Sequence, residues 1–313
     1  MNATEKNTDG PPILVTGAAK GGTGKSTTIA NIAASFARQG HKVLMLDFDS
    51  QGSATRLLAP QDHNDNVRRL EALKDVNLIE KELDRLTNFE VPIESSMARI
   101  LQGELVKPIL TFGVGLVGYH NLVNQLATGL TDPNNQIKLT DGIDLVIADY
   151  QPDVVLIDTP PSHSPAFSTS LTIATHILSA MEPSIEGLRG VMIANKQRLN
   201  LNRRFHMDIE LAGVIPVGVT QGKVCEQILQ IARIIYGDAV TSSISHGTVV
   251  KEASIEGMPV YDYEEMMRKI VPEYQKSSTK FNRIGAQFME VARQIATRIG
   301  LHQAPPLTAN AES

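Results

Sequence analysis

The sequence has a single cysteine and no tryptophan, and no long apolar run interrupts it. One cysteine, Cys225, excludes a disulfide within the chain and argues against a cysteine-based metal cluster. Because Cys225 lies within a helical pattern, we interpret it as a small buried side chain. No apolar run reaches the ~20 residues that span a bilayer, and residues 1–10 lack the apolar core of a signal peptide. We therefore expect a cytoplasmic protein.

Excess positive charge is also missing, since the net charge is −5 for 313 residues. Affinity for nucleic acid must then come from a local basic patch. The chain is 42% hydrophobic and 20% charged, which is typical of a globular protein and sufficient for a large core. Its eight histidines are scattered without metal-ligand spacing. His163 alone lies near a motif described below, and we interpret it as a loop residue.

Apolar runs alternate with amphipathic segments along most of the chain, which predicts an α/β fold. In this fold a doubly wound, mostly parallel sheet carries helices on both faces. The expected strands are at residues 13–15, 42–48, 113–118, 154–157, 177–181 and 213–219. The expected helices are at about 26–39, 136–148, 186–201, 223–236 and 278–299.

One domain is expected to cover residues 12–300, between a disordered polar tail at 1–11 and a flexible tail at 301–313. Residues 53–150 form the least regular part, which we interpret as a variable, mainly helical elaboration. Its first portion is expected on one side of the sheet. The Asp-Pro-Asn-Asn stretch predicts a loop over 131–136. Because only a short tail precedes the first strand, no helix-turn-helix domain is expected ahead of it.

A glycine-rich stretch, K-G-G-T-G-K-S-T at residues 20–27, lies between the first strand and the first helix. This context predicts a phosphate-binding loop, because glycines let the backbone approach a polyphosphate and the helix N-terminus favours its charge. Lys25 supplies a cation for the outer phosphates, and the Ser26 hydroxyl can ligate Mg²⁺. The candidate nucleotide-binding residues are Gly21, Gly22, Thr23, Gly24, Lys25, Ser26 and Thr27. The Thr27 hydroxyl is expected to contact the α-phosphate.

Carboxylates follow two of the apolar strands. The strand at 42–48 runs into Asp47-Phe48-Asp49-Ser50-Gln51-Gly52, and the strand at 154–157 ends in Asp158-Thr159-Pro160-Pro161. Ligands of doubly wound sheets bind at the carboxyl ends of the strands, so these aspartates are candidates for the same site as the glycine-rich loop. Asp158 is predicted near Mg²⁺, together with Ser26.

Together these motifs resemble the deviant Walker A P-loop NTPases of the ParA/MinD family, whose loop reads K-G-G-x-x-K-[ST]. Two departures are Ala19, where the general P-loop pattern has glycine, and Ser50, where the family has proline. The resemblance implies Mg²⁺-dependent hydrolysis of ATP by Lys20, Lys25 and Asp49. It implies that Lys20 reaches the phosphates of the other subunit in an ATP-sandwich homodimer. It further implies that Asp49 positions the attacking water and that Asp47 lies beside the Mg²⁺ shell.

For the function, the resemblance implies a nucleoid-associated ParA-type ATPase that binds DNA without sequence preference. A ParB-like partner would stimulate hydrolysis, and the cycle would segregate plasmid or chromosomal DNA. The candidate DNA contacts are Lys196, Arg198, Arg203, Arg204, Lys223 and Lys251. A second basic region, residues 264–300, has seven Lys or Arg against four Glu. Residues 244–260 resemble a family block with arginines where this chain has His246 and Val249, which weakens its assignment to DNA.

Other functions remain open. A positioning ATPase for a protein cargo, such as carboxysomes or chemotaxis arrays, would have the same biochemical activity as a DNA-segregating ATPase and differ in its cargo. A MinD-like ATPase would insert the helix at 278–299 into a membrane, but its apolar stripe also fits packing on the sheet, and we expect no stable membrane association. A metabolic P-loop enzyme is disfavoured by the D-x-D-S-Q-G motif and the 252–260 block. The lone cysteine argues against iron–sulfur relatives.

Overall fold

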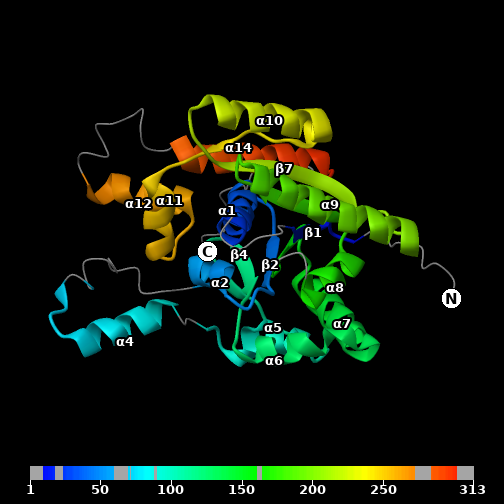
Figure 1. Ribbon diagram of the computed structural model, residues 1–313. Helices are drawn as coiled ribbons and strands as arrows, with labels where there is room; N and C mark the ends of the chain where they lie inside the picture. The colour runs from blue at the N-terminus through cyan, green and yellow to red at the C-terminus, as the bar shows by residue number, and fades with distance from the viewer. Residues whose placement is uncertain are drawn as a thin grey trace, which may run out of the picture.

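The computed structural model of the protein describes residues 10–17, 24–59, 70, 72–87, 90–160, 164–271 and 283–301. A central sheet lies between two layers of helices (Figure 1). This arrangement confirms the α/β fold with a mostly parallel sheet. Among the described residues, none of the helices combines the length and apolar character needed to cross a bilayer.

The sheet has eight strands in the order β3-β4-β2-β5-β1-β6-β7-β8. Among the described residues, the β3–β4 pair at one edge is antiparallel and the other strand pairs are parallel. The central strands are buried along their whole length, which explains their continuous apolar runs. The strands are β1 (Ile13–Thr16), β2 (Val43–Asp47), β3 (Ile109–Thr111), β4 (Val114–Val117), β5 (Val154–Asp158), β6 (His176–Met181), β7 (Glu210–Val219) and β8 (Ile244–Ser245).

Two apolar clusters cover the two faces of the sheet. On one face, helices α1, α2, α11, α12 and α14 pack together, and on the other, α5 to α8 do so. Helices α9 and α10 share a smaller cluster with β6 and β7. The helices are α1 (Lys25–Arg38), α2 (Ser53–Leu58), α4 (Val76–Thr87), α5 (Met97–Ile100), α6 (Leu122–Thr128), α7 (Pro133–Tyr150), α8 (Pro165–Ile173), α9 (Ile185–Phe205), α10 (Lys223–Tyr236), α11 (Thr248–Ile255), α12 (Val260–Ile270) and α14 (Arg283–Arg298).

Three local expectations are wrong. The stretch 131–136 is not a loop throughout, because Asp132 caps α7 by accepting a hydrogen bond from the Asn134 amide, and Pro133 is the first helical residue. The segment after residue 53 does not lie on one side of the sheet, since α2 and α5 pack on opposite faces. Cys225 is half-buried rather than buried.

The C-terminal helix packs on the domain as expected. In α14 the side chains of Phe288, Val291 and Ile295 are buried in the same cluster as α1. The apolar stripe of α14 therefore packs against the rest of the domain. The segments 1–9 and 302–313, which include most of the two expected tails, lie outside the described residues.

Candidate active site

Three adjacent strands carry polar side chains to one edge of the sheet. Strand β5 lies between β1 and β2, and its last residue, Asp158, pairs in register with Asp47 at the end of β2. Thr16 ends β1 next to them, and its hydroxyl lies 3.1 Å from Asp158 Oδ1. Helix α1 begins at Lys25 after Gly24, which has a φ of +74°, a conformation that glycine adopts without strain. The described end of the glycine-rich stretch, residues 24–27, therefore lies beside the aspartates at the ends of β2 and β5.

Lys25 is the cation at the centre of this site. Its Nζ bonds to Asp158 Oδ1 and lies 3.5 Å from Asp49 Oδ2 and 3.5 Å from Ser26 Oγ. The Lys25 side chain is only 8% exposed. Burial alone lowers the pKa of Lys25, but the charges of Asp158, Asp49 and Asp47 outweigh it and raise this pKa. The ammonium is therefore firmly protonated and shared between two carboxylates.

Asp158 retains one unused acceptor. Its Oδ1 is bonded to Lys25 and Thr16, whereas Oδ2 is fully buried and has no hydrogen-bond partner within the described part of the chain. A buried carboxylate oxygen without a partner is costly, so a metal-bound water or a cation is expected there. The half-buried Ser26 side chain lies beside the same lysine. These oxygen donors fit Mg²⁺, which binds one or two protein ligands together with phosphates. Within the described residues, no three His, Cys, Asp or Glu side chains form a metal cluster of their own.

Asp47 is fully buried and occupied by hydrogen bonds. Its Oδ2 accepts from the Thr55 amide at 2.7 Å and the Thr55 hydroxyl at 2.6 Å, and its Oδ1 accepts from the Asp49 amide at 3.2 Å. Burial, followed by the charge of Asp158, raises the pKa of Asp47 to about 7, although the bonds from Thr55 lower it. Asp47 thus anchors the segment that carries Asp49, and the role beside Mg²⁺ that the resemblance implies stays a prediction.

Asp49 is buried at the mouth of the site. Its Oδ1 accepts a hydrogen bond from the Gln51 amide at 3.0 Å, and its Oδ2 faces Lys25. Burial raises the pKa of Asp49, against the charge of Lys25, which lowers it. A carboxylate with a raised pKa, one oxygen of which is fixed by the backbone, is suited to orient a water molecule and accept its proton.

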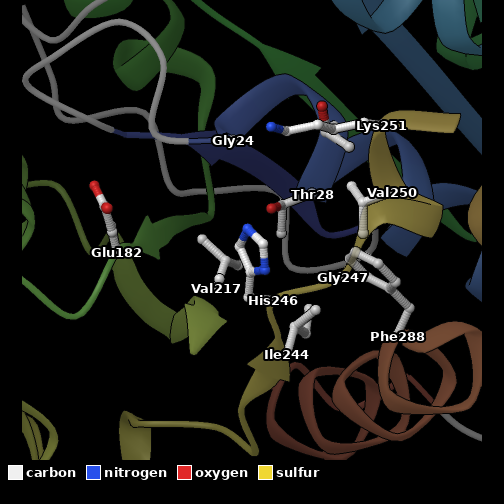
Figure 2. A pocket seen from close by; sticks show the side chains of 12 residues that line it. Gly24, Thr28, Glu182, Val217, Ile244, His246, Gly247, Val250, Lys251 and Phe288 are labelled. Atoms are coloured by element: carbon white, nitrogen blue, oxygen red, sulfur yellow. The ribbon is translucent and has the colours of Figure 1, made fainter. Parts of the chain in front are cut away.

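A pocket of about 290 Å³ opens beside the start of α1 (Figure 2). The ring of His246 projects into its middle, between Val217 and Thr28, and the Lys251 side chain extends toward Gly24. The walls are mostly apolar and come from α1, β7, β8, α11 and α14. The lining residues are Gly24, Thr27, Thr28, Glu182, Val217, Gly218, Ile244, His246, Gly247, Val250, Lys251 and Phe288.

Four predicted site residues, Lys20, Gly21, Gly22 and Thr23, lie outside the described residues. Their roles remain predictions. His163, which we interpret as a loop residue, also lies outside them. Gly24, Lys25, Ser26 and Thr27, in contrast, lie at the expected edge of the sheet.

The six candidate DNA contacts fall into three groups. Lys196, Arg203 and Arg204 on α9 and Lys223 on α10 are exposed. Arg198 is half-buried, and its guanidinium donates to the Ile209 carbonyl at 2.6 Å and to Asn195 Oδ1 at 2.9 Å, so it braces the end of α9. Lys251 lies in the pocket beside α1.

Sequence reasoning missed two kinds of residue. Thr16 and Thr55 hold the aspartates, but a lone threonine carries no distinguishing pattern. Arg189 is exposed on α9, seven residues before Lys196 and fourteen before Arg203, so the three share one face. The heptad spacing of these three cations was visible in the sequence and could have identified the face.

The chain is similar to a known family and to several known proteins. A model of the AAA_31 family, described as an AAA domain, matches residues 12–210. The chromosome partitioning protein ParA of Caulobacter vibrioides is 26% identical over 258 residues, which cover 80% of this chain and 87% of that protein. The maintenance of carboxysome distribution protein A of Synechococcus elongatus is 24% identical over 245 residues, covering 76% and 87%.

Among solved structures, the ATP complex of a substituted McdA from Cyanothece is similar with a TM-score of 0.66 at 15% identity. The match covers 94% of this chain and 98% of that one. At this identity the likeness establishes a shared fold.

Proposed function

Because this chain is a member of the ParA/MinD family of AAA-domain ATPases, we propose that it is a nucleotide-switched partition or positioning ATPase. The observation that carries the proposal is the convergence of Lys25, Asp49 and Asp158 beside a pocket at the N-terminus of α1. A buried lysine held between two carboxylates is poised to exchange one of them for a phosphate. In this proposal, ATP binding draws Lys25 toward the outer phosphates.

Hydrolysis requires positioning and charge neutralisation more than covalent chemistry. Lys25 neutralises the developing charge, and Asp49 orients the attacking water. Mg²⁺, held through Ser26 and Asp158, supplies further neutralisation of the phosphate oxygens when bound. Asp158 Oδ2 is the buried acceptor that supports this assignment.

The pocket beside α1 fits the nucleoside. Gly24 and Thr27 border the phosphate end, and Val217, Ile244 and Phe288 supply apolar contacts for a flat base. The His246 ring lies in the middle of this pocket and can stack on the base (Figure 2). Lys251 lines the same pocket, so in this proposal it contacts the nucleotide and not DNA.

We further propose that the ATP-bound protein is a sandwich homodimer completed by Lys20, as the family resemblance implies. Non-specific DNA would bind to the outer face of α9 and α10. These two helices carry seven Lys or Arg against two Glu, in a protein whose net charge is −5. In the second basic region, Arg268 and Arg293 pair with Glu265 and Glu290 on their own helices, which favours α9 and α10.

A ParB-like partner would stimulate hydrolysis and release the DNA. Two kinds of cargo are open, since one relative is named for chromosome partitioning and another for carboxysome distribution. We place DNA segregation first, with positioning of a protein cargo as the alternative.

The DNA face is tested by a pair of matched triple variants. We expect Arg189→Ala/Lys196→Ala/Arg203→Ala to lose ATP-dependent DNA binding and most of its salt dependence. The control, Arg268→Ala/Lys269→Ala/Arg293→Ala, removes the same charge from α12 and α14 and should bind as the wild type does. Equal losses in both variants would contradict the assignment to α9.

ATP hydrolysis is tested with DNA present and without an acceptor metabolite. Release of phosphate at a slow basal rate supports the ATPase, whereas turnover only with a small-molecule acceptor supports a metabolic enzyme. ATP-dependent flotation with anionic liposomes, in the absence of DNA binding, would instead support a MinD-like membrane cycle.

A further inference from the structure

Thr55 connects three segments at the edge of the active site. It is fully buried near the start of α2. Its hydroxyl donates to Asp47 Oδ2 at 2.6 Å and accepts from the Tyr119 amide at 2.7 Å. Asp47 in turn accepts a hydrogen bond from the Asp49 amide. A continuous path of hydrogen bonds thus runs from Tyr119, just beyond the end of β4, to the backbone of Asp49.

We propose that Thr55 is a positioning residue for ATP hydrolysis, which holds Asp49 in place through Asp47. This inference rests on the proposed function, because it assigns to Asp49 the task of orienting water. Thr55 touches no reacting atom itself. It acts by fixing the turn on which Asp49 is carried.

Other contacts also hold the turn between Asp49 and α2. The Gln51 amide donates to Asp49 Oδ1 at 3.0 Å, and the Arg56 guanidinium donates to the Gln51 carbonyl at 2.6 Å. The Gly52 amide donates to the Asp49 carbonyl at 2.9 Å, and Gly52 has a φ of +56°, a left-handed conformation that glycine accommodates. A Cβ at Gly52 would lie 2.9 Å from Cδ1 of Tyr119, so the aromatic ring packs directly on the turn. Tyr119 therefore supports Asp49 twice, by packing on Gly52 and through Thr55.

The path also reaches the segment that follows the helix α4. The Tyr119 carbonyl accepts a hydrogen bond from the Val91 amide at 3.1 Å, where the chain returns to the body of the protein. A Cβ at Gly118 would lie 2.6 Å from Val91 and 3.1 Å from the Thr55 methyl group. The close packing leaves this junction little freedom to move independently of the active site.

Replacement of Thr55 by valine keeps the shape but removes the hydroxyl. Asp47 then loses a donor and the Tyr119 amide loses its acceptor, both in a buried place. The Thr55 amide still donates to Asp47 Oδ2 at 2.7 Å, so the anchor of the Asp49 turn is weakened. A small displacement of a water-orienting group lowers turnover by about 10- to 100-fold, while affinity for the nucleotide, which is set by the P-loop and the pocket, stays within about twofold.

Three variants test the proposal by separating turnover from binding. In Thr55→Val we expect kcat to fall about 10-fold or more, with the Kd for a fluorescent ATP analogue unchanged. Thr55→Ser keeps the hydroxyl and should retain kcat within about threefold. Thr241→Val removes another buried threonine hydroxyl, at the far edge of the sheet, and should leave kcat unchanged.

Amide hydrogen exchange at Tyr119 supplies a second reading that does not depend on hydrolysis. Because the Thr55 hydroxyl accepts the hydrogen bond of this amide, exchange at the amide should accelerate about 10-fold or more in Thr55→Val and not in Thr55→Ser. If the wild type does not hydrolyse ATP, the proposed function fails, and the exchange rates still test the hydrogen-bond path.

Wild-type kcat in Thr55→Val would overturn the positioning role. An equal loss in Thr55→Ser would also overturn it, because the methyl contact with Gly118 rather than the hydroxyl would then be responsible. A Kd that rises about tenfold in Thr55→Val, in proportion to the loss of turnover, would also overturn it, because the whole site would then be disturbed. If Thr55→Val does not fold, the comparison of Thr55→Ser with the wild type still decides the outcome.

Discussion

Removing the charge of Lys25 should destabilise the protein in the absence of any nucleotide. In Lys25→Met the carboxylates of Asp158 and Asp49 lose the ammonium between them, and Asp158 is left with Thr16 as its remaining hydrogen-bond donor among the described residues. At 3.5 Å and an effective dielectric constant of about 20, one such attraction is worth about 5 kcal/mol before the cost of burying the charges.

Breaking a buried pair by removing one partner costs about 3–5 kcal/mol, because the other charge stays buried without compensation. Unfolding entropy of about 2.1 cal/mol/K per residue converts this cost into a melting temperature lower by roughly 5–8 °C. The pKa of Asp49 should rise further, since the charge of Lys25 lowers it in the wild type. Because acid protonates the carboxylate that Lys25 no longer neutralises, the difference in melting temperature between Lys25→Met and the wild type should be smaller at acidic pH.

Thermal unfolding of the nucleotide-free protein, followed by circular dichroism at neutral and acidic pH, measures this effect. Lys251→Met is the matched control, because this lysine is exposed and also lines the pocket. An unchanged melting temperature in Lys25→Met, or an equal loss in Lys251→Met, would refute the reasoning from the buried pair.

Two further predictions concern the same site, and a third concerns the packing of α7 on α5. Asp49→Ala should bind ATP as the wild type does and hydrolyse it at least about 100-fold more slowly, and equal single-turnover rates would contradict the role of Asp49. The pKa of Asp47, raised to about 7, means that the folded state binds this proton more tightly than the unfolded chain. The free energy of unfolding should therefore fall as pH rises from about 4 to 7. Urea titrations at several pH values should show that the free energy of unfolding depends less on pH in Asp47→Asn than in the wild type. An equal pH dependence would exclude Asp47 as its source. Gly142→Ala should lower the free energy of unfolding by about 1–3 kcal/mol despite better helix propensity, because its Cβ would lie 2.4 Å from the Ile100 carbonyl oxygen. Wild-type stability in a denaturant titration would contradict that clash.

The parts of the fold that local patterns govern could be predicted. The run Val43 to Leu46 is apolar at every position because β2 is buried on both faces, and the same holds for β5. Aspartates at the ends of these two strands meet because parallel strands end at one edge. The contact of Lys25 with Asp49 and Asp158 follows from that placement.

The rest depends on contacts between distant segments. Nothing near Thr55 in the sequence indicates that its hydroxyl meets the Tyr119 amide, 64 positions away. The role of Arg198 likewise depends on the Ile209 carbonyl, which lies on the strand side of the turn after α9. A basic run predicts an exposed cationic face, but only the folded chain shows which of its members are already engaged.

Nucleotide-dependent DNA binding tests the central claim most directly. Mobility shifts of a non-specific duplex should be measured without nucleotide, with ADP and with ATP, for the wild type and for Lys20→Ala. The account predicts binding with ATP alone, steeply weakened by salt, and its loss in Lys20→Ala. Binding that is equal in all three nucleotide states, or absent from all of them, would contradict a nucleotide-switched DNA-binding ATPase.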